Sequence, residues 1–446
     1  MRTAKPTSLA HGVVWFGGGY GLAIVGYLAL NATAARLLGA STFGYFVGIL
    51  TLTTVLGQIG LLGVHRSGLR EAARLSHDDV EQLAELRRGV RATTLVSLPA
   101  VSVVSGLVTW FLLGSLGTGD RTVMSIGVAL LVVLSGLQKV WANYLRGFGH
   151  VRFAGLLEGR SGGALVALIQ AGLVALVWIF VPSWGLAGAL GAVAVGYAIP
   201  VLWASRVVAR SWAHVSGKGH LLKDLRVVAK RDWRFASAQV AILLNASIEI
   251  WIAGALLSRA DTSMFGAAQR MSMLVVLPMT AMGVVFSPTI SRMVVASDRK
   301  HLETLVRTGA TLATVATALI CLPLLVMPQL VVRIVFGPGF ADAAVPVMVL
   351  SVAMLLNAVM GLAGLTMSMA HREGTVAWMQ WTTLVARVGV GCLVASAFGL
   401  EALAVSSAVW STAFFVGIWV AAWRKLGVNT VATLHPRLSL VRETAG

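Results

Sequence analysis

The sequence predicts an all-α membrane protein with twelve transmembrane helices, arranged as two parallel six-helix repeats. Three observations support this prediction. Of the 446 residues, 57% are hydrophobic and only 12% are charged, which is about half the charge of an ordinary soluble domain. Apolar runs of about 20 residues, the length that a bilayer core requires, recur between short polar breaks. The second half of the chain also repeats landmarks of the first half in the same order.

The apolar runs place the spanning helices along the chain. We expect them at residues 11–35, 42–64, 92–113, 121–144, 155–181, 185–207, 235–258, 264–290, 308–330, 341–369, 375–398 and 400–422. They define an N-terminal bundle (1–207), a basic cytoplasmic linker (208–234), a C-terminal bundle (235–423) and a cytoplasmic tail (424–446). The linker separates apolar from basic residues on two helix faces, as helices on an anionic leaflet do. Two other cytoplasmic segments, opened by Ser76–Asp79 and Ser297–Asp298, are expected to be capped helices.

The distribution of basic residues predicts the orientation. If both termini are cytoplasmic, 28 of the 35 lysines and arginines lie in cytoplasmic segments and only four lie outside. Cytoplasmic loops of membrane proteins carry such an excess. The net charge of +18 therefore reflects topology, and no nucleic-acid partner is expected. Both cysteines lie inside apolar runs, so neither a disulfide framework nor a metal site is indicated, and we expect no cofactor.

The two halves carry matching landmarks at nearly constant offset. Phe43-Gly44 opens the second helix and Phe265-Gly266 opens the eighth, 222 positions later. The capped cytoplasmic segments recur about 219 positions apart, and the sixth and twelfth helices begin with WGLAGAL and FGLEALA. Because six is an even number, each half begins and ends on the same side of the membrane, so the halves are parallel repeats. Two such bundles form the architecture of an alternating-access transporter.

Residues 35–74 and 256–293 resemble the polysaccharide-transport branch of the multidrug/oligosaccharidyl-lipid/polysaccharide (MOP) exporter superfamily, which includes O-antigen-type flippases. The Phe-Gly helix starts, the Arg66–Arg70 cluster and Pro288-Thr-Ile-Ser291 carry this resemblance. It implies flipping of a polyprenyl-pyrophosphate-linked oligosaccharide across a bacterial inner membrane, for cell-surface polysaccharide assembly. It also implies MATE-like, V-shaped bundles whose cavity is lined by helices one, two, seven and eight. We expect the protein to act as a monomer among membrane lipids.

A charged pair inside the predicted C-terminal bundle is the first candidate site. A carboxylate at the centre of a spanning helix costs about 2.5–3.5 kcal/mol on insertion scales, yet Glu249 lies within helix seven. Arg270 lies at a similar depth in the antiparallel helix eight, so we expect the two to form an ion pair. Three alternatives stay open. The pair locks two helices together, or Arg270 meets a pyrophosphate while Glu249 orients it or exchanges a proton, or the two side chains face lipid or extend toward the interface. A proton or sodium ion as coupling cation rests on this single carboxylate.

Other intramembrane and mouth residues are weaker candidates for substrate contact. Arg387 lies in the middle of helix eleven and needs a partner or water, whereas Lys139 lies near the cytoplasmic end of helix four and can extend to the interface. Polar side chains of the central helices are more typical of helix–helix hydrogen bonds. The candidates of this kind, together with the arginines near the two mouths, are Asn31, Arg36, Gln58, Asn245 and Arg66.

The charges and loops of the predicted spans also bear on other functions. A lipid II flippase and a MATE-type multidrug exporter belong to the same superfamily and stay open. A cation exporter favours an anionic cavity, whereas the predicted spans hold one glutamate against Lys139, Arg270 and Arg387. An enzyme is not expected, because the predicted outer loops are tight turns without histidine. The sequence also lacks a Walker motif, so a gradient or a downstream reaction must drive transport.

Overall fold

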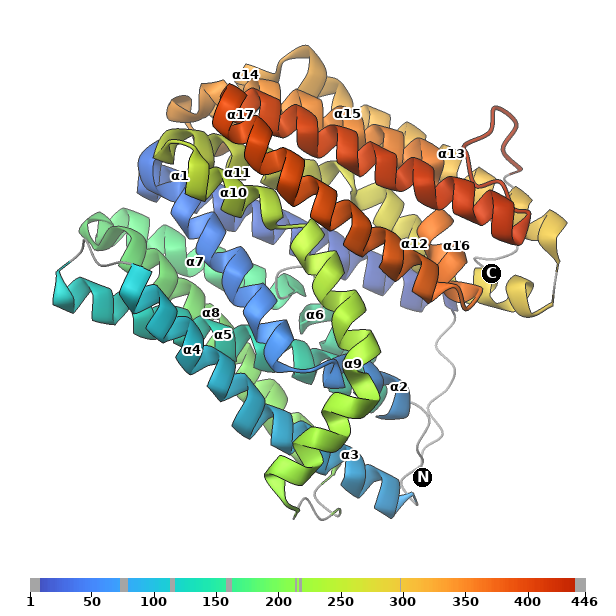
Figure 1. Cartoon of the computed structure of the whole chain (residues 1–446), viewed down its shortest axis with the longest axis horizontal. Coiled ribbons are helices and arrows are strands. Elements are labelled where there is room, and N and C mark those ends of the chain that lie inside the picture. The colour runs from blue at the N-terminus through green and yellow to red at the C-terminus, as the bar shows by residue number, and fades with distance from the viewer. Residues whose placement is uncertain are drawn as a thin grey trace. The chain divides into compact units, whose positions relative to one another are not determined.

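The computed structural model describes residues 9–72, 79–112, 117–157, 163–212, 215, 219–296 and 298–437. This part of the chain consists of helices and their connections, without strands (Figure 1). It divides into two compact units. One unit is Leu22–Ser247, and the other is Ile248–Gly446 together with the chain up to Gly21. The boundary falls later than the predicted linker, because the linker residues continue into a long helix of the first unit.

The membrane helices agree with the predicted class. Eight helices in the described part are long and apolar enough to span, or ten if two bent pairs each count as one span. Two very long helices, α1 (Leu9–Gly60) and α17 (Glu373–Leu426), contain non-helical glycines, Gly39 at φ 66° and Gly399 at φ 79°. The 54 residues of α17 would measure about 80 Å as one straight helix, far more than a bilayer core of about 30 Å. The count of twelve spans stays a prediction.

The unit Leu22–Ser247 is built around one helix, α5. Its elements after α1 are α2 (Val64–Ala72), α3 (Val80–Ala92), the π-turn η1 (Thr93–Ser97), α4 (Leu98–Leu112), α5 (Thr118–Gly147), α6 (Val151–Leu157), α7 (Gly163–Phe180), η2 (Pro182–Trp184), α8 (Gly185–Ser211) and α9 (Leu221–Asn245). Helix α5 packs against α2, α4, α6 and α8. Figure 1 shows α4, α5 and α8 as neighbouring rods in this unit.

The expected cytoplasmic helix and third span form one continuous element. Helix α3 passes through η1 into α4 without a loop. The hydroxyl of Thr93 donates hydrogen bonds to the carbonyl oxygens of Gly89 and Val90, at 3.1 and 2.9 Å. Such back-bonding satisfies the hydroxyl without ending the helix, and a π-turn absorbs the extra residue. Of the predicted cap, Ser76–Asp78 lie outside the described residues, and Asp79 makes no side-chain capping bond.

The predicted surface linker helix is part of α9 and is anchored by a buried carboxylate. Asp232 accepts a hydrogen bond of 2.7 Å from Ser67 Oγ and two bonds of 3.0 and 3.1 Å from Arg231. The side chain of Asp232 is 1% exposed. Burial alone would lower the pKa of Arg231, but the hydrogen bonds and charge of Asp232 outweigh it and raise that pKa. The linker is therefore a packed element of this unit, and α9 contacts both α2 and α3.

The second unit is centred on α15. Its elements are α10 (Ile248–Leu256), α11 (Arg259–Val275), α12 (Leu277–Val295), α13 (Arg299–Val326), α14 (Pro328–Phe336), η3 (Pro338–Ala343), α15 (Ala344–Met360), α16 (Ala363–Met369) and α17. Helix α15 packs against α11, α13 and α17 (Figure 1). The predicted cap of the helix after Ser297 is confirmed at Asp298, which accepts from His301 N at 3.2 Å. These bonds from His301 also lower the pKa of Asp298.

The predicted cytoplasmic tail folds back onto this unit. Helix α15 ends at Gly361, whose φ of 77° interrupts the helix. The carbonyls that this break leaves open accept hydrogen bonds from the tail: Met360 O from Thr430 Oγ1 at 2.7 Å and Val359 O from Ala432 N at 2.9 Å. Unsatisfied carbonyls are costly in an apolar environment. The tail therefore completes the hydrogen bonding of a broken helix.

Candidate functional site: a buried ion pair and neighbouring arginine

The predicted acidic site residue, Glu249, lies in the first turn of α10 and is almost fully enclosed. The side chain of Glu249 is 3% exposed and that of Arg387, on α17, is 11% exposed. Arg387 contacts Glu249 Oε1 through both Nε and Nη2. Its Nη2 also donates to Ser407 Oγ at 3.1 Å, on the second half of the same helix. Two stretches of α17 and the start of α10 thus meet at one charge-assisted network.

Glu249 forms its ion pair with Arg387, whereas the sequence predicts Arg270 as the partner. The pairing with Arg270 stays a prediction. Depth along a helix predicts at what height a side chain lies, but not toward which neighbour it points. Helix α10 packs closely against α17, more extensively than against α11. The rotation of α10 therefore brings Glu249 to Arg387, 138 positions away in the chain.

Arg270 remains a buried cation of the same unit. It lies in α11, within a buried stretch that runs from Thr262 to Met271 with one half-buried exception, and it is 2% exposed. A charge at such a position is rare in membrane helices and usually marks function. The position of Arg270 in a stretch of mostly apolar or small residues therefore keeps it as a candidate site residue.

The carboxylates that are buried among the described residues are balanced by guanidinium groups. Two carboxylates are buried, Asp232 and Glu249, and each is paired with a guanidinium. Arg270 adds a buried positive charge. No group of three histidine, cysteine, aspartate or glutamate side chains in the described part is arranged as a metal site. The interior as described therefore leaves no carboxylate without a basic partner.

The other six predicted site residues lie in the unit Leu22–Ser247. Asn31 is buried and its Nδ2 donates to Tyr27 O at 2.7 Å, while Asn245 Nδ2 donates to Ala241 O at 3.0 Å. Gln58 is buried, and its Oε1 has no hydrogen-bond partner among the described residues. The remaining three are basic and less enclosed, with Lys139 half-buried and Arg36 and Arg66 exposed. The side chain of Arg70 lies outside the described residues.

Sequence reasoning missed two parts of these polar networks. Ser407 gives little signal in the sequence, because it is a serine in an apolar helix. Asp232 lies in the predicted surface linker, although an aspartate directly after Arg231 within an amphipathic helix could indicate a buried pair. Its partner Ser67 lies 165 positions away, so no local pattern connects the two.

The chain is similar in fold to solved MATE transporters. An inward-facing multidrug resistance MATE family transporter of the MOP superfamily aligns with a TM-score of 0.64 and 15% identity, over 92% of this chain and 94% of that chain. The MATE transporter VcmN of Vibrio cholerae in its bent form aligns with a TM-score of 0.59 and 16% identity, over 94% and 97%. An outward-facing MATE family transporter of the MOP superfamily gives 0.54 and 17%, over 94% and 96%.

No family model matches the sequence, and no curated protein matches it. At identities of 14–17% the likeness to these structures concerns the fold. The prediction of an all-α membrane protein with a MATE-like fold is confirmed. The polysaccharide branch of the superfamily stays a prediction.

Proposed function

We propose that this protein is a MOP-type transporter that flips a polyprenyl-pyrophosphate-linked oligosaccharide from the cytoplasmic to the outer leaflet of a bacterial inner membrane. The fold supports a transporter, since the matched structures are transporters that have been solved in inward- and outward-facing states. The sequence resemblance to flippases supports the substrate. Flipping requires no cofactor, and energy comes from a gradient or from consumption of the product on the outer side.

The charge of the buried residues carries the choice of substrate. A lipid pyrophosphate presents concentrated negative charge, and guanidinium groups match phosphate geometry with paired donors. Arg270 is 2% exposed in α11, and in this proposal it contacts the pyrophosphate. Arg387 is held by Glu249 and Ser407, so the carboxylate orients a second guanidinium. A multidrug exporter of cations would instead need a carboxylate without a basic partner, and both buried carboxylates of the described residues have one.

Flipping by purified protein tests the proposal. The protein is reconstituted in liposomes with a fluorescent polyprenyl-pyrophosphate glycan, and a membrane-impermeant quencher reports the labelled lipid that reaches the outer leaflet. We expect faster flipping than in empty liposomes. Arg270→Gln should slow it at least about tenfold, since a hydrogen bond to a charged group contributes about 1.5–3 kcal/mol. Arg270→Lys keeps the charge and should retain part of the rate.

A matched control and a competing assay complete this test. Arg333→Gln removes an exposed arginine of the same unit and should flip like wild type. Flipping no faster than in empty liposomes, together with gradient-driven export of a cationic dye, would replace the flippase by a multidrug exporter. The same liposomes with and without a proton or sodium gradient test cation coupling, and equal rates under both conditions argue against it.

A further inference from the structure

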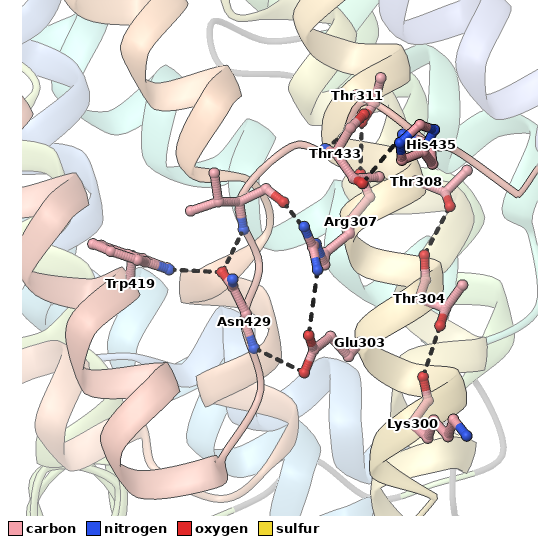
Figure 2. A network of polar contacts seen from close by, with 11 residues as sticks. Lys300, Glu303, Thr304, Arg307, Thr308, Thr311, Trp419, Asn429, Thr433 and His435 are labelled. Atoms are coloured by element: carbon pink, nitrogen blue, oxygen red, sulfur yellow. Dashed lines mark hydrogen bonds and ion pairs between the residues drawn. The ribbon is translucent and has the colours of Figure 1, made fainter.

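The C-terminal tail and α13 enclose a basic cavity that the proposed transport function does not use. The tail follows Gly427, which ends α17 in a left-handed conformation at φ 67°. Asn429 N donates to Glu303 Oε2 at 3.3 Å, and Arg307 Nε donates to Val431 O at 3.2 Å. Thr433 N donates to Thr311 Oγ1 at 2.8 Å. Figure 2 shows how these bonds lay the tail along α13.

Further contacts hold the shape of this wall. Trp419 Nε1 donates to Asn429 Oδ1 at 3.0 Å, which also accepts from Val431 N (Figure 2). Arg437 N donates to Thr308 Oγ1 at 3.2 Å. Val428 is 1% exposed and belongs to the hydrophobic core of the unit. The tail is therefore packed at its start and hydrogen-bonded along its length, which makes it a fixed wall.

The cavity between tail and helix has the size of a small-ligand site. Its volume is about 420 Å³, within the usual range of about 300–1,000 Å³ for ligand pockets. Its lining consists of four permanently charged basic residues, one acidic residue, three threonines and one histidine: Arg299, Lys300, Arg307, Arg437, Glu303, Thr304, Thr308, Thr433 and His435. Four cations against one carboxylate leave a net charge of +3, without counting the histidine.

The single carboxylate of the lining is already engaged. Glu303 Oε1 lies 3.6 Å from Arg307 Nη1, and Glu303 Oε2 accepts a hydrogen bond from the backbone N–H of Asn429. The side chains of Arg299, Lys300 and Arg437 are exposed and form no ion pair with a described residue. The N-terminus of α13 does not contribute to the positive charge of the cavity, because the carboxylate of Asp298 caps it. An anionic ligand would therefore meet three cations that no described residue neutralises.

We propose that this cavity binds a phosphate group and that the C-terminal tail forms one of its walls. Guanidinium and ammonium donors on one concave surface match the several acceptor oxygens of a phosphate. The group could belong to a lipid headgroup of the cytoplasmic leaflet or to a soluble phosphate compound, and both present the same oxygens. This site is separate from the proposed transport of pyrophosphate-linked glycans and does not depend on it.

Binding to the full-length protein tests this site. In detergent, inorganic phosphate is titrated by calorimetry, because pyrophosphate would also bind the proposed transport site. In nanodiscs, the melting temperature is compared between phosphatidic acid and phosphatidylcholine. Saturable phosphate binding indicates a soluble source, and stabilisation by phosphatidic acid alone indicates a lipid source. Absence of both effects overturns the proposal.

Three variants separate a built site from general positive charge. Lys300→Gln/Arg437→Gln should weaken binding about tenfold or more, since each charged hydrogen bond is worth about a factor of ten. Glu303→Gln keeps an acceptor for Asn429 N–H and removes the negative charge, so binding should tighten a few-fold. Arg424→Gln removes an exposed arginine outside the lining and should have no effect. Equal weakening by Arg424→Gln and the double variant would overturn the site, as would unchanged affinity in the double variant. Melting curves without ligand establish that all variants are folded.

Discussion

Removing the charge of Glu249 gives the most direct test of the buried pair. The side chain of Arg387 is 11% exposed, and in Glu249→Gln its guanidinium loses its counter-ion. Removing one partner of a buried pair typically costs about 3–5 kcal/mol. For a unit of about 200 residues, this corresponds to a melting temperature lower by roughly 6–20 °C. Arg387→Met should cost a similar amount, because it leaves the carboxylate unpaired.

Replacing both partners separates stability from transport. Glu249→Leu/Arg387→Met removes both charges, and such apolar replacements are often neutral or stabilising. We therefore expect this double variant to melt close to wild type, although each single change is strongly destabilising. Tryptophan fluorescence during heating in detergent measures stability, and the liposome assay measures flipping. Glu401→Gln, an exposed glutamate in α17, is the matched control.

Two results would refute this reasoning. If Glu249→Gln melts within about 2 °C of wild type, the pair contributes little, contrary to the cost expected for an enclosed charge. If the apolar double variant flips its substrate at the wild-type rate, the pair only joins α10 to α17 and has no part in transport. A stable double variant that does not flip would support the proposed function.

Three further predictions concern other parts of the molecule. Gly361→Ala should release the tail, because Gly361 has a φ of 77° and the added Cβ would lie 2.1 Å from the carbonyl oxygen of Thr430. Limited proteolysis measures the release. Gly364→Ala, whose added Cβ has its nearest contact at 3.9 Å, should behave like wild type. Asp232→Ala should destabilise α9 by about 1.5–3 kcal/mol, since Arg231 loses its hydrogen bonds, and unchanged hydrogen exchange in α9 would contradict this. His65 is buried and its pKa is lowered to about 3, first by burial and then by nearby positive charges. Unfolding returns this pKa to about 6.5, so stability should fall below pH 6.5 by about 1.4 kcal/mol per unit; His65→Phe should flatten melting temperatures between pH 7.5 and 5.

Local patterns predicted the class of the fold and many helix positions. Apolar run length and glycine breaks are properties of consecutive residues, so the long helices and the break near Gly399 follow from the sequence. The cap at Asp298 is equally local. The continuous helix through Thr93–Ser97 was missed, because a π-turn leaves no signal that differs from a short polar junction.

Pairings between distant helices could not be predicted in the same way. The partner of Glu249 depends on how α10 is rotated about its axis, which packing against α17 decides. The docking of the tail depends on two carbonyls that become available only because Gly361 adopts a positive φ. Residues 428–437 show no apolar periodicity, so they resembled a free cytoplasmic tail. In both cases the missing information lies in side-chain packing between segments that are distant in sequence.

The hydrogen bond between Thr430 and Met360 joins residues 70 positions apart, and this separation has a consequence for synthesis. Ribosomes add about 5–20 residues per second, so Met360 is made roughly 4–14 s before Thr430. During that interval the end of α15 must satisfy its carbonyls with water or with the insertion machinery. The C-terminal unit can therefore reach its final structure only after Thr430 has been synthesised, and a ribosome that stalls after residue 427 would leave this helix end uncapped.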